Sequence, residues 1–300
     1  MKKRAGKVVS KQGPVTQVFD RPFSVLANKN VVFDDENKGH QLGDCSGCDI
    51  ATNSQRRIND STPHPETRAE GKSSIHLLNN ELTFERDGAG RLAATASAAL
   101  PEIEAVLAQL DPDKAGIRLH GIDSLRAYLT PGGPIGDIAV GTIGPAARPV
   151  RAILFDKTPT TNWSLGWHQD RTIVVAERRE VPGFGPWTVK AGLLHVAPPF
   201  ELLSRMVTLR VHLDPVAKDN APLLIAPGSH RFGRVLESDI DSVVARCGVA
   251  TCLAGAGDVW LYATPILHAS DAASAPGRRR VLQIDYAAEA LPGGLAWFGI

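Results

Sequence analysis

The sequence has little of what marks secreted, membrane-spanning or nucleic-acid-binding proteins. It contains four cysteines in 300 residues, too few for a disulfide framework, so we expect a protein of the reducing cytoplasm. It has no run of about 18 apolar residues, and its basic start MKKR does not lead into the apolar stretch of a signal peptide. We therefore expect neither a membrane span nor secretion. The formal net charge of +1 provides no overall basic field for nucleic acid.

The chain divides into two regions of different texture, with a border near residue 75. Residues 1–75 are rich in Asn, Asp, Ser, Thr and Gly and show neither helical nor strand periodicity. Such a segment buries too little apolar surface to offset the entropy lost on ordering, so we predict a disordered polar tail. Residues 76–300 alternate apolar runs with turns that contain Gly and Pro, which predicts one folded domain.

Strand patterns dominate the later part of this domain. In residues 206–213 (MVTLRVHL) the apolar side chains Val207, Leu209 and Val211 alternate with polar ones, which indicates a strand with one face in the core. Short apolar runs between turn residues predict further strands over 150–157, 162–170, 223–226, 257–262 and 280–286. Helices are predicted within 101–110 and 121–144. The pattern therefore predicts an all-β core with flanking helices, of the antiparallel sandwich or jelly-roll class.

The segment Trp167-His168-Gln169-Asp170 carries the most specific chemical signal. Alternate side chains of a strand share a face, so His168 and Asp170 point the same way and can provide two ligands to one metal ion. His268, in the segment LYATPILHAS, is the natural third ligand. Two histidines and one carboxylate leave three coordination positions open, which is the arrangement of non-haem Fe(II) oxygenases. A His-x-Asp alone is more often structural, so the assignment needs support from the residues beyond His268.

Two residues on the C-terminal side of His268 are placed to bind a carboxylate. Arg279 stands eleven residues beyond His268 at the head of an apolar strand, where a fixed guanidinium can form two hydrogen bonds to a carboxylate. Ser270 lies on the same strand face as His268 and can donate another hydrogen bond. Arg278 and Arg280 alternate to the opposite face, so the three arginines do not form one basic surface. This combination suits the far carboxylate of 2-oxoglutarate.

These segments together resemble the phytanoyl-CoA dioxygenase family of Fe(II)- and 2-oxoglutarate-dependent oxygenases. The resemblance rests on WHQD, NAPLLIAPGSHR, GDVWLYATPILHAS and GRRRVLQIDYA, and it covers roughly residues 78–297. It implies a double-stranded β-helix, that is, a cupin-like jelly roll. It also implies Fe(II) as the metal, 2-oxoglutarate and O2 as cosubstrates, and a small organic molecule as the substrate.

The family pattern implies roles for seven positions of this sequence. The residues that bind iron and form the catalytic centre are His168, Asp170 and His268. The residues that contact the cosubstrate are Arg279, Ser270, Trp187 and Lys157. The related halogenases have a small residue where this sequence has Asp170, so the resemblance favours hydroxylation, or another oxidation, with release of succinate and CO2.

Other polar residues receive structural interpretations or stay open. The CxxC formed by Cys45 and Cys48 has no second ligand pair nearby and is interpreted as a solvated loop. His212 is interpreted as a structural histidine, with a pocket-lining role as the alternative. His195 is a candidate for lining the substrate pocket, and it belongs to a segment, 171–205, that we predict to be the lid of that pocket.

Two alternatives to the oxygenase hypothesis stay open. One is a cupin-like metalloenzyme that does not use 2-oxoglutarate, and the other is a non-catalytic jelly roll that binds a metal or ligand. Replacement of Arg279 separates the first alternative from the leading hypothesis, because only a 2-oxoglutarate enzyme depends on that arginine. The sequence does not select among acyl-CoA thioesters, amino-acid-like osmolytes and secondary metabolites as substrates. It does not define an oligomeric state.

Overall fold

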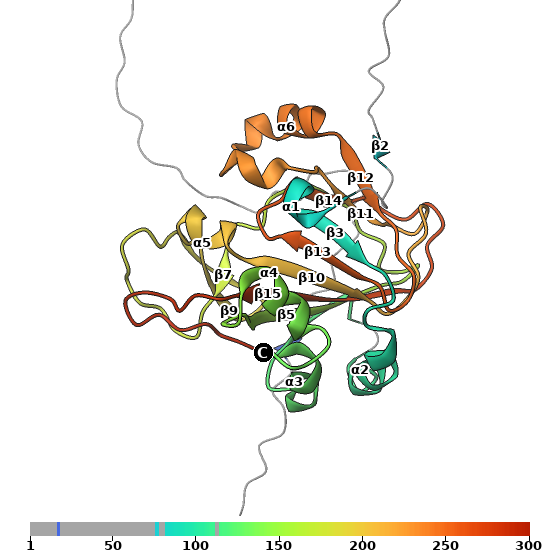
Figure 1. Cartoon of the computed structure of the whole chain (residues 1–300), viewed down its shortest axis with the longest axis horizontal. Helices are drawn as coiled ribbons and strands as arrows, with labels where there is room; N and C mark the ends of the chain where they lie inside the picture. The colour runs from blue at the N-terminus through green and yellow to red at the C-terminus, as the bar shows by residue number, and fades with distance from the viewer. Residues whose placement is uncertain (1–16, 19–75, 78–81, 112–113) are drawn as a thin grey trace, which may run out of the picture. The chain divides into compact units, whose positions relative to one another are not determined.

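A seven-stranded sheet and a five-stranded sheet form the centre of the molecule (Figure 1). The structure is a computed structural model that describes residues 17–18, 76–77, 82–111 and 114–300. Apart from residues 17–18, the predicted tail of residues 1–75, including its CxxC, lies outside the described residues. The predicted border near residue 75 therefore stays a prediction.

The strands of both sheets come from distant parts of the sequence. The larger sheet has the order β1 (Gln17–Val18), β4 (Gly116–Leu119), β5 (Arg148–Lys157), β15 (Arg279–Ala287), β10 (Val207–His212), β13 (Val259–Ala263) and β3 (Ala89–Leu92), and all its neighbours are antiparallel. The smaller sheet has the order β2 (His76–Leu77), β12 (Val249–Cys252), β11 (Leu223–Ile225), β14 (His268–Ser270) and β6 (Leu165–His168). Its only parallel pair is β2 with β12 among the described strands.

Helices cover the outer faces of the two sheets. The α-helices are α1 (Phe84–Asp87), α2 (Leu100–Leu107), α3 (Asp123–Leu129), α4 (Gly136–Ile143), α5 (Phe200–Ser204) and α6 (Ile240–Cys247), and the 3-10 helices are η2 (Ser97–Ala99), η3 (Ser229–Phe232) and η4 (Glu237–Asp239). Helices α2, α3 and α4 pack in one buried apolar cluster with β10 and β15. Helix α6 packs on the smaller sheet through Ile240 and Val243, next to Leu267.

Strand β10 shows how the sequence pattern creates two different faces. Val207, Leu209 and Val211 point outward into the apolar cluster beneath the helices, as the alternation predicts. Each such buried side chain stabilises the fold by about 1.5–3 kcal/mol. Thr208 and Arg210, which alternate with them, point to the opposite face and are also buried. The larger sheet therefore has an apolar outer face and a polar inner face.

The inner face of the larger sheet carries an unusual number of buried polar side chains. They are Lys157, Thr208, Arg210, His212, Arg279, Gln283 and Asp285, and Arg151 beside them is mostly buried. Strand register places them side by side: Arg151 lies opposite Asp285, and Lys157 opposite Arg279. Burial of polar and charged groups is costly unless they are bonded, so this face is the part of the fold that indicates a ligand site.

The segment between β6 and β10 contains a third sheet that the sequence pattern does not reveal. Residues 171–205, which the sequence predicts as a pocket lid, form β7 (Ile173–Val174), β8 (Trp187–Lys190) and β9 (Leu193–Val196), in the order β7-β9-β8, and then α5. Their apolar side chains form a separate buried cluster. The strands have two to four residues, too few to show a clear period.

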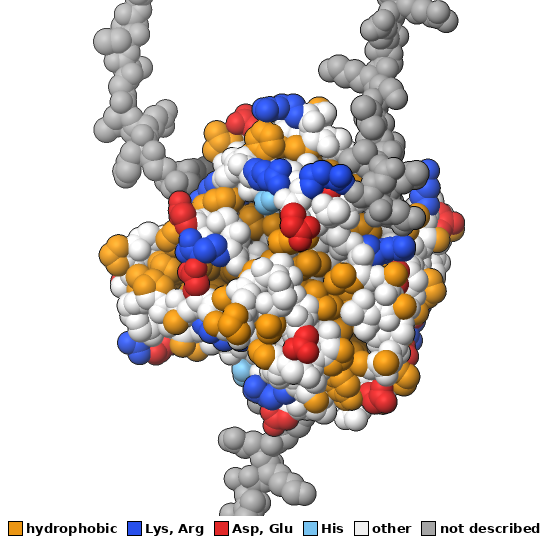
Figure 2. All heavy atoms as spheres, viewed as in Figure 1, with side chains coloured by type: hydrophobic (Ala, Val, Ile, Leu, Met, Phe, Trp, Pro, Cys, Tyr) orange, Lys and Arg blue, Asp and Glu red, His pale blue; other side chains and the backbone are white. Residues whose placement is uncertain are grey.

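The surface mixes charges of both signs. On the face shown in Figure 2, basic and acidic side chains are interspersed with apolar and neutral polar ones. Within the described part of the chain, no helix has the length and apolar character that a membrane crossing requires.

Candidate active site

The ends of β6 and β14 bring the three predicted metal ligands together. His168 and His268 lie directly opposite each other in the antiparallel pairing of these strands, and their ring centroids are 4.2 Å apart. Asp170 lies two residues beyond the end of β6. His168, Asp170 and His268 each offer a ligand atom, and these atoms all lie within 4.8 Å of one another. The three side chains can therefore hold one metal ion.

Both imidazoles are oriented for metal binding by the backbone. Nδ1 of His168 lies 2.8 Å from the carbonyl oxygen of Gly166, and Nδ1 of His268 lies 2.9 Å from that of Ile266. A carbonyl oxygen only accepts, so Nδ1 carries the proton in each ring and Nε2 has a free lone pair. This is the usual arrangement of metal-binding histidines, whose other nitrogen is held by a backbone or carboxylate acceptor. The donor set fits a divalent metal with nitrogen and oxygen ligands.

The charge states of the ligands also suit a metal. Burial lowers the pKa of His268 to about 3, so its ring is neutral at physiological pH. Burial would raise the pKa of the Asp170 carboxyl, but Arg151 and the two histidines hold it below its usual value. Neutral imidazole and ionised carboxylate are the forms that coordinate metals.

Gln169 lies between two of the predicted ligands and fixes the chain there. Its Nε2 donates to the carbonyl oxygens of Gly233 at 3.0 Å and Pro265 at 2.8 Å. Its Oε1 accepts from the backbone N–H of Val235 at 3.0 Å. One buried side chain therefore ties the segment after β6 to two loops, one of which leads into His268.

Replacement of Gln169 by methionine, which has a similar size, tests this anchoring. We expect the free energy of unfolding to fall by about 2–5 kcal/mol, because buried backbone groups of Val235, Gly233 and Pro265 lose their partner. Denaturant unfolding of the full chain measures the change. Thr160→Ala, a change at a position on a turn, serves as the control. An unfolding midpoint equal to that of the unaltered protein would contradict a structural role for Gln169.

Lys157, Ser270 and Arg279 meet on the side of the site next to β5 and β15. Lys157 Nζ lies 3.3 Å from Ser270 Oγ and donates to the carbonyl oxygen of Trp163 at 2.7 Å. Arg279 lies opposite Lys157 on the neighbouring strand and donates to the carbonyl oxygen of Ala221. Its Nε has no hydrogen-bond partner among the described residues. The structure thus brings three of the four predicted cosubstrate contacts together.

Sequence reasoning misses Arg210 as a member of this group. Arg210 is buried on the inner face of β10, donates to Gln283 Oε1 at 3.1 Å, and has an Nε without a partner in the described part of the chain. Burial, then the charge of Arg210, lowers the pKa of Arg279 to about 9. Burial, then Arg279 and Arg210, lowers the pKa of Lys157 to about 7. The side chains of three buried cationic residues therefore repel one another here.

His212 also faces this cationic group. The sequence interpretation is a structural histidine with satisfied hydrogen bonds, but neither ring nitrogen has a partner among the described residues. Burial, with the nearby charges of Arg210 and Arg279, lowers the pKa of His212 to about 3. The alternative pocket-lining interpretation therefore fits the structure better. The only signal in the sequence is that His212 alternates with the core face of its strand.

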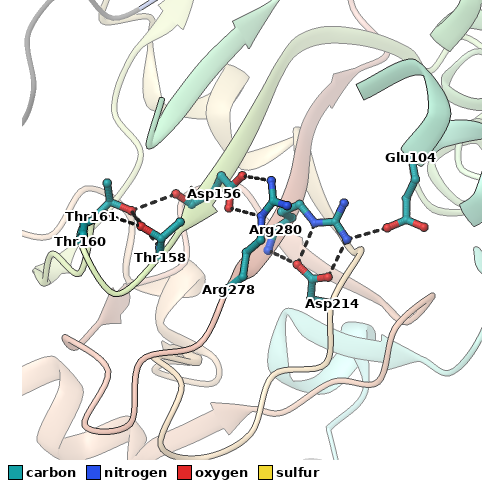
Figure 3. Close-up of polar contacts among 8 residues, drawn as sticks. All are labelled: Glu104, Asp156, Thr158, Thr160, Thr161, Asp214, Arg278 and Arg280. Atoms are coloured by element: carbon teal, nitrogen blue, oxygen red, sulfur yellow. Dashed lines mark hydrogen bonds and ion pairs between the residues drawn. The ribbon is translucent and has the colours of Figure 1, made fainter. Parts of the chain in front are cut away.

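The arginines on either side of Arg279 point outward, as predicted. Figure 3 shows Arg278 paired with Asp156, at 2.8 Å, and Arg280 paired with Asp214 and Glu104, at 2.7 and 2.6 Å. These ion pairs on the outer face fix the strand on both sides of Arg279. The inward direction of its side chain is therefore determined by the alternation of β15.

Two other candidate residues belong to the third sheet. Trp187 is partly buried against the apolar cluster of that sheet, and its ring lies 5.4 Å from the guanidinium carbon of Arg178. The structure does not bring it to Lys157, Ser270 or Arg279. His195 is buried, and its Nδ1 lies 3.3 Å from Thr172 Oγ1.

A comparison with models of protein families matches the central part of the chain. The model described as phytanoyl-CoA dioxygenase (PhyH) matches residues 145–281, which contain all seven of the predicted site residues. Over residues 145–281 the chain is therefore similar to the phytanoyl-CoA dioxygenase family. The oxygenase class predicted from the sequence, with Fe(II) and 2-oxoglutarate, agrees with this family match.

Solved structures resemble the fold of this chain. EctD from S. alaskensis in its apo form has a TM-score of 0.51 and 19% identity, over 72% of this chain and 78% of its own. HygX from Streptomyces hygroscopicus, solved with nickel and 2-oxoglutarate, has a TM-score of 0.45 and 15% identity, over 68% and 84%. SnoN, an epimerase from nogalamycin biosynthesis, has a TM-score of 0.46 and 16% identity, over 70% and 87%. The likeness to EctD confirms the predicted jelly roll with flanking helices.

A comparison with proteins of curated function finds no match.

Proposed function

We propose that this chain is an Fe(II)- and 2-oxoglutarate-dependent dioxygenase that hydroxylates a small organic molecule, with release of succinate and CO2. The observation that carries the proposal is the cluster of His168, Asp170 and His268, in which both histidines donate Nδ1–H to the backbone. These two imidazoles and one carboxylate would hold Fe(II), and this donor set is typical of non-haem Fe(II) oxygenases. When bound, Fe(II) with 2-oxoglutarate and O2 supplies the oxidising chemistry.

The cationic group beside the metal ligands supports 2-oxoglutarate as the cosubstrate. Lys157, Arg210 and Arg279 place three cationic side chains on the inner face, and the nearby Asp271 counteracts the lowered pKa of Lys157 only in part. Buried charges need a partner of opposite sign. A dianion such as 2-oxoglutarate supplies one, which favours this proposal over a cupin-like enzyme without the cosubstrate.

Several residues of the chain bind and orient 2-oxoglutarate. Arg279, Ser270 and Lys157 bind the far carboxylate of 2-oxoglutarate by hydrogen bonds and charge. Arg210 influences the pKa values of both His268 and Arg279, so it lies near the path between the metal ligands and the far carboxylate. His212 faces the same cationic group. Burial of His268 and Arg279 keeps water away from the bound cosubstrate.

Three further expectations from the sequence remain predictions. They are the cytoplasmic location, the domain border near residue 75, and the contact of Trp187 with the cosubstrate. Hydroxylation, as one of the oxidations that such a metal site can support, is likewise part of the proposal.

Anaerobic metal and cosubstrate binding tests the proposed function. Purified full-length protein is titrated with Fe(II) and then with 2-oxoglutarate, and we expect the visible charge-transfer absorption of an Fe(II)–2-oxoglutarate chelate. The protein is then exposed to O2 with each member of a library of metabolites. We expect more succinate with the right substrate than without any substrate. Failure to bind any divalent metal, or metal binding that 2-oxoglutarate does not alter, would rule the proposal out.

The lowered pKa of Lys157 predicts a pH-dependent affinity for 2-oxoglutarate. Burial, then Arg279 and Arg210, lowers this pKa to about 7 in the unliganded protein, whereas a bound carboxylate stabilises the ammonium and raises it. Above pH 7 the dianion therefore binds with uptake of a proton. We expect the affinity to fall by up to about tenfold per pH unit between about pH 7 and 9.

Calorimetry on the Co(II)-loaded protein, in two buffers of different ionisation enthalpy, measures both the affinity and the proton uptake. Lys157→Met is the matched control, because it keeps most of the side-chain volume and removes the titrating group. Its affinity is expected to be lower and nearly independent of pH over this range. An equally steep pH dependence in the variant would show that another group takes up the proton.

A further inference from the structure

Arg151 joins the predicted metal ligand Asp170 to a second buried carboxylate. Its Nη2 lies 3.5 Å from Asp170 Oδ2, and its Nε donates to Asp285 Oδ2 at 2.5 Å. The Arg151 side chain is 13% exposed and that of Asp285 5%, so solvent screens these contacts weakly. One guanidinium thus serves two carboxylates, of which only Asp170 belongs to the proposed metal site.

Asp285 is held in place by the strand on its other side. Its Oδ1 accepts a hydrogen bond from Thr208 Oγ1 at 3.0 Å, and the Thr208 hydroxyl lies 3.1 Å from that of Thr264. Because Thr208 donates to Asp285, it accepts from Thr264. Arg151 and Thr208 both lie directly opposite Asp285 in the strand register. These contacts span β5, β15, β10 and the turn after β13.

The charge of Arg151 links the two carboxylates, Asp170 and Asp285. A guanidinium is always protonated in proteins, and Arg151 lies within ion-pair distance of both Asp285 and Asp170. A rigid charged fork held by Asp285 fixes the position of the Asp170 oxygen that faces it.

We propose that Arg151 is a positioning residue, which holds Oδ2 of Asp170 so that the carboxylate offers only its other oxygen, Oδ1, to the metal. The proposal rests on the proposed function and deepens it. A carboxylate that binds through one oxygen leaves three coordination positions free, whereas one that binds through both oxygens leaves two. 2-Oxoglutarate and O2 would need the positions that a carboxylate bound through one oxygen leaves free. Asp285 and Thr208 act through Arg151.

A purely structural role makes a different prediction. If Arg151 serves only to neutralise Asp285, then removing both charges together restores a normal site. If Arg151 positions Asp170, then the metal site is still altered when Asp285 no longer needs a partner. The double variant Arg151→Met with Asp285→Asn therefore separates the two roles, and it avoids leaving a buried unpaired carboxylate.

The test measures Co(II) binding to the full-length protein by calorimetry and by the visible absorption spectrum, which reports coordination geometry. Co(II) is used because it does not react with O2 under these conditions. We expect the unaltered protein to bind one Co(II), and the Kd to rise about 10- to 100-fold in Arg151→Met and in the double variant. The visible spectrum is expected to change in both. Arg151→Lys keeps the charge but not the two-pronged guanidinium. Its Kd for Co(II) is expected to lie between those of the unaltered protein and Arg151→Met.

Arg148→Gln is the matched control, because Arg148 lies on the same strand but donates to the carbonyl oxygens of Ala288 and Glu289 at the strand end. We expect its Kd and spectrum to equal those of the unaltered protein. A folded double variant, verified by circular dichroism, that binds Co(II) with the original Kd and spectrum would overturn the positioning role. No Co(II) binding by the unaltered protein would instead refute the proposed function.

Discussion

Replacement of Asp170 by alanine is expected to lower the affinity for Fe(II) or Co(II) more than about 100-fold and to abolish succinate formation. Changes that only disturb the partners of metal ligands cost about 10- to 100-fold in affinity, and this change removes a ligand and its negative charge. The two histidines that remain, His168 and His268, are held by the backbone. Calorimetry with Co(II), combined with a succinate assay, measures both effects.

The apolar replacement at this position should leave the protein folded. Asp170 is a partly buried carboxylate whose burial opposes its charge, so its removal also removes a desolvation cost. Arg151 keeps its partner Asp285. Asp241→Ala, at an exposed position of α6, is the control. Metal affinity and turnover that survive unchanged in Asp170→Ala would contradict the assignment of this carboxylate as a ligand.

Replacement of Arg279 by methionine is expected to raise the Kd for 2-oxoglutarate roughly 100- to 1000-fold, with little change in the Kd for Co(II). The loss corresponds to about 3–4 kcal/mol, the range for removing one partner of a buried ion pair. The two affinities respond differently because Arg279 lies on β15, whereas two of the proposed metal ligands lie on β6 and β14. Calorimetry with 2-oxoglutarate on the Co(II)-loaded variant measures the effect.

The folding stability of this variant provides a second readout. Arg279 is repelled by Arg210, and its guanidinium donates a hydrogen bond to the carbonyl oxygen of Ala221. Its replacement in the unliganded protein therefore removes a repulsion along with that hydrogen bond. Arg246→Met, at an exposed position of α6, controls for loss of a charge. Undiminished affinity for 2-oxoglutarate in Arg279→Met would favour a metalloenzyme that does not use this cosubstrate.

The parts of the site that could be predicted from the sequence are those encoded by short spacing. His168 and Asp170 are two residues apart, and His268, Ser270 and Arg279 lie within one segment of twelve. Strand alternation places His268 and Ser270 on one face, and the short spacing places Asp170 just beyond the end of β6 and Arg279 at the start of β15. The same alternation made the apolar face of β10 predictable.

The residues that could not be predicted depend on which strands become neighbours. Arg151 and Asp285 are 134 residues apart in the sequence, and their contact results from the register of β5 against β15. Arg210 joins Gln283 for the same reason, over 73 residues. Nothing near these residues in the sequence marks them as partners. Strand pairing is set by the packing of the whole sheet.

Short elements escape prediction for a related reason. Strands β3, β4 and the strands of the third sheet have two to four residues, and a run of that length cannot distinguish a period of two from chance. Strand β6 is likewise shorter than the predicted 162–170, because its pairing with β14 ends at His168. Asp170 therefore lies beyond the strand, where Gln169 holds the chain.

The position of β6 links metal binding to folding. In the order of the five-stranded sheet, β6 lies next to β14 and is the last of the described strands, and two register pairs join it to β14, of which one is His168 with His268. A metal bound by both histidines would tie this outer strand to its neighbour. The free energy of metal binding would then add to the free energy of unfolding as RT ln(1 + [metal]/Kd). Fluctuations that detach β6 and release of the metal would be the same event.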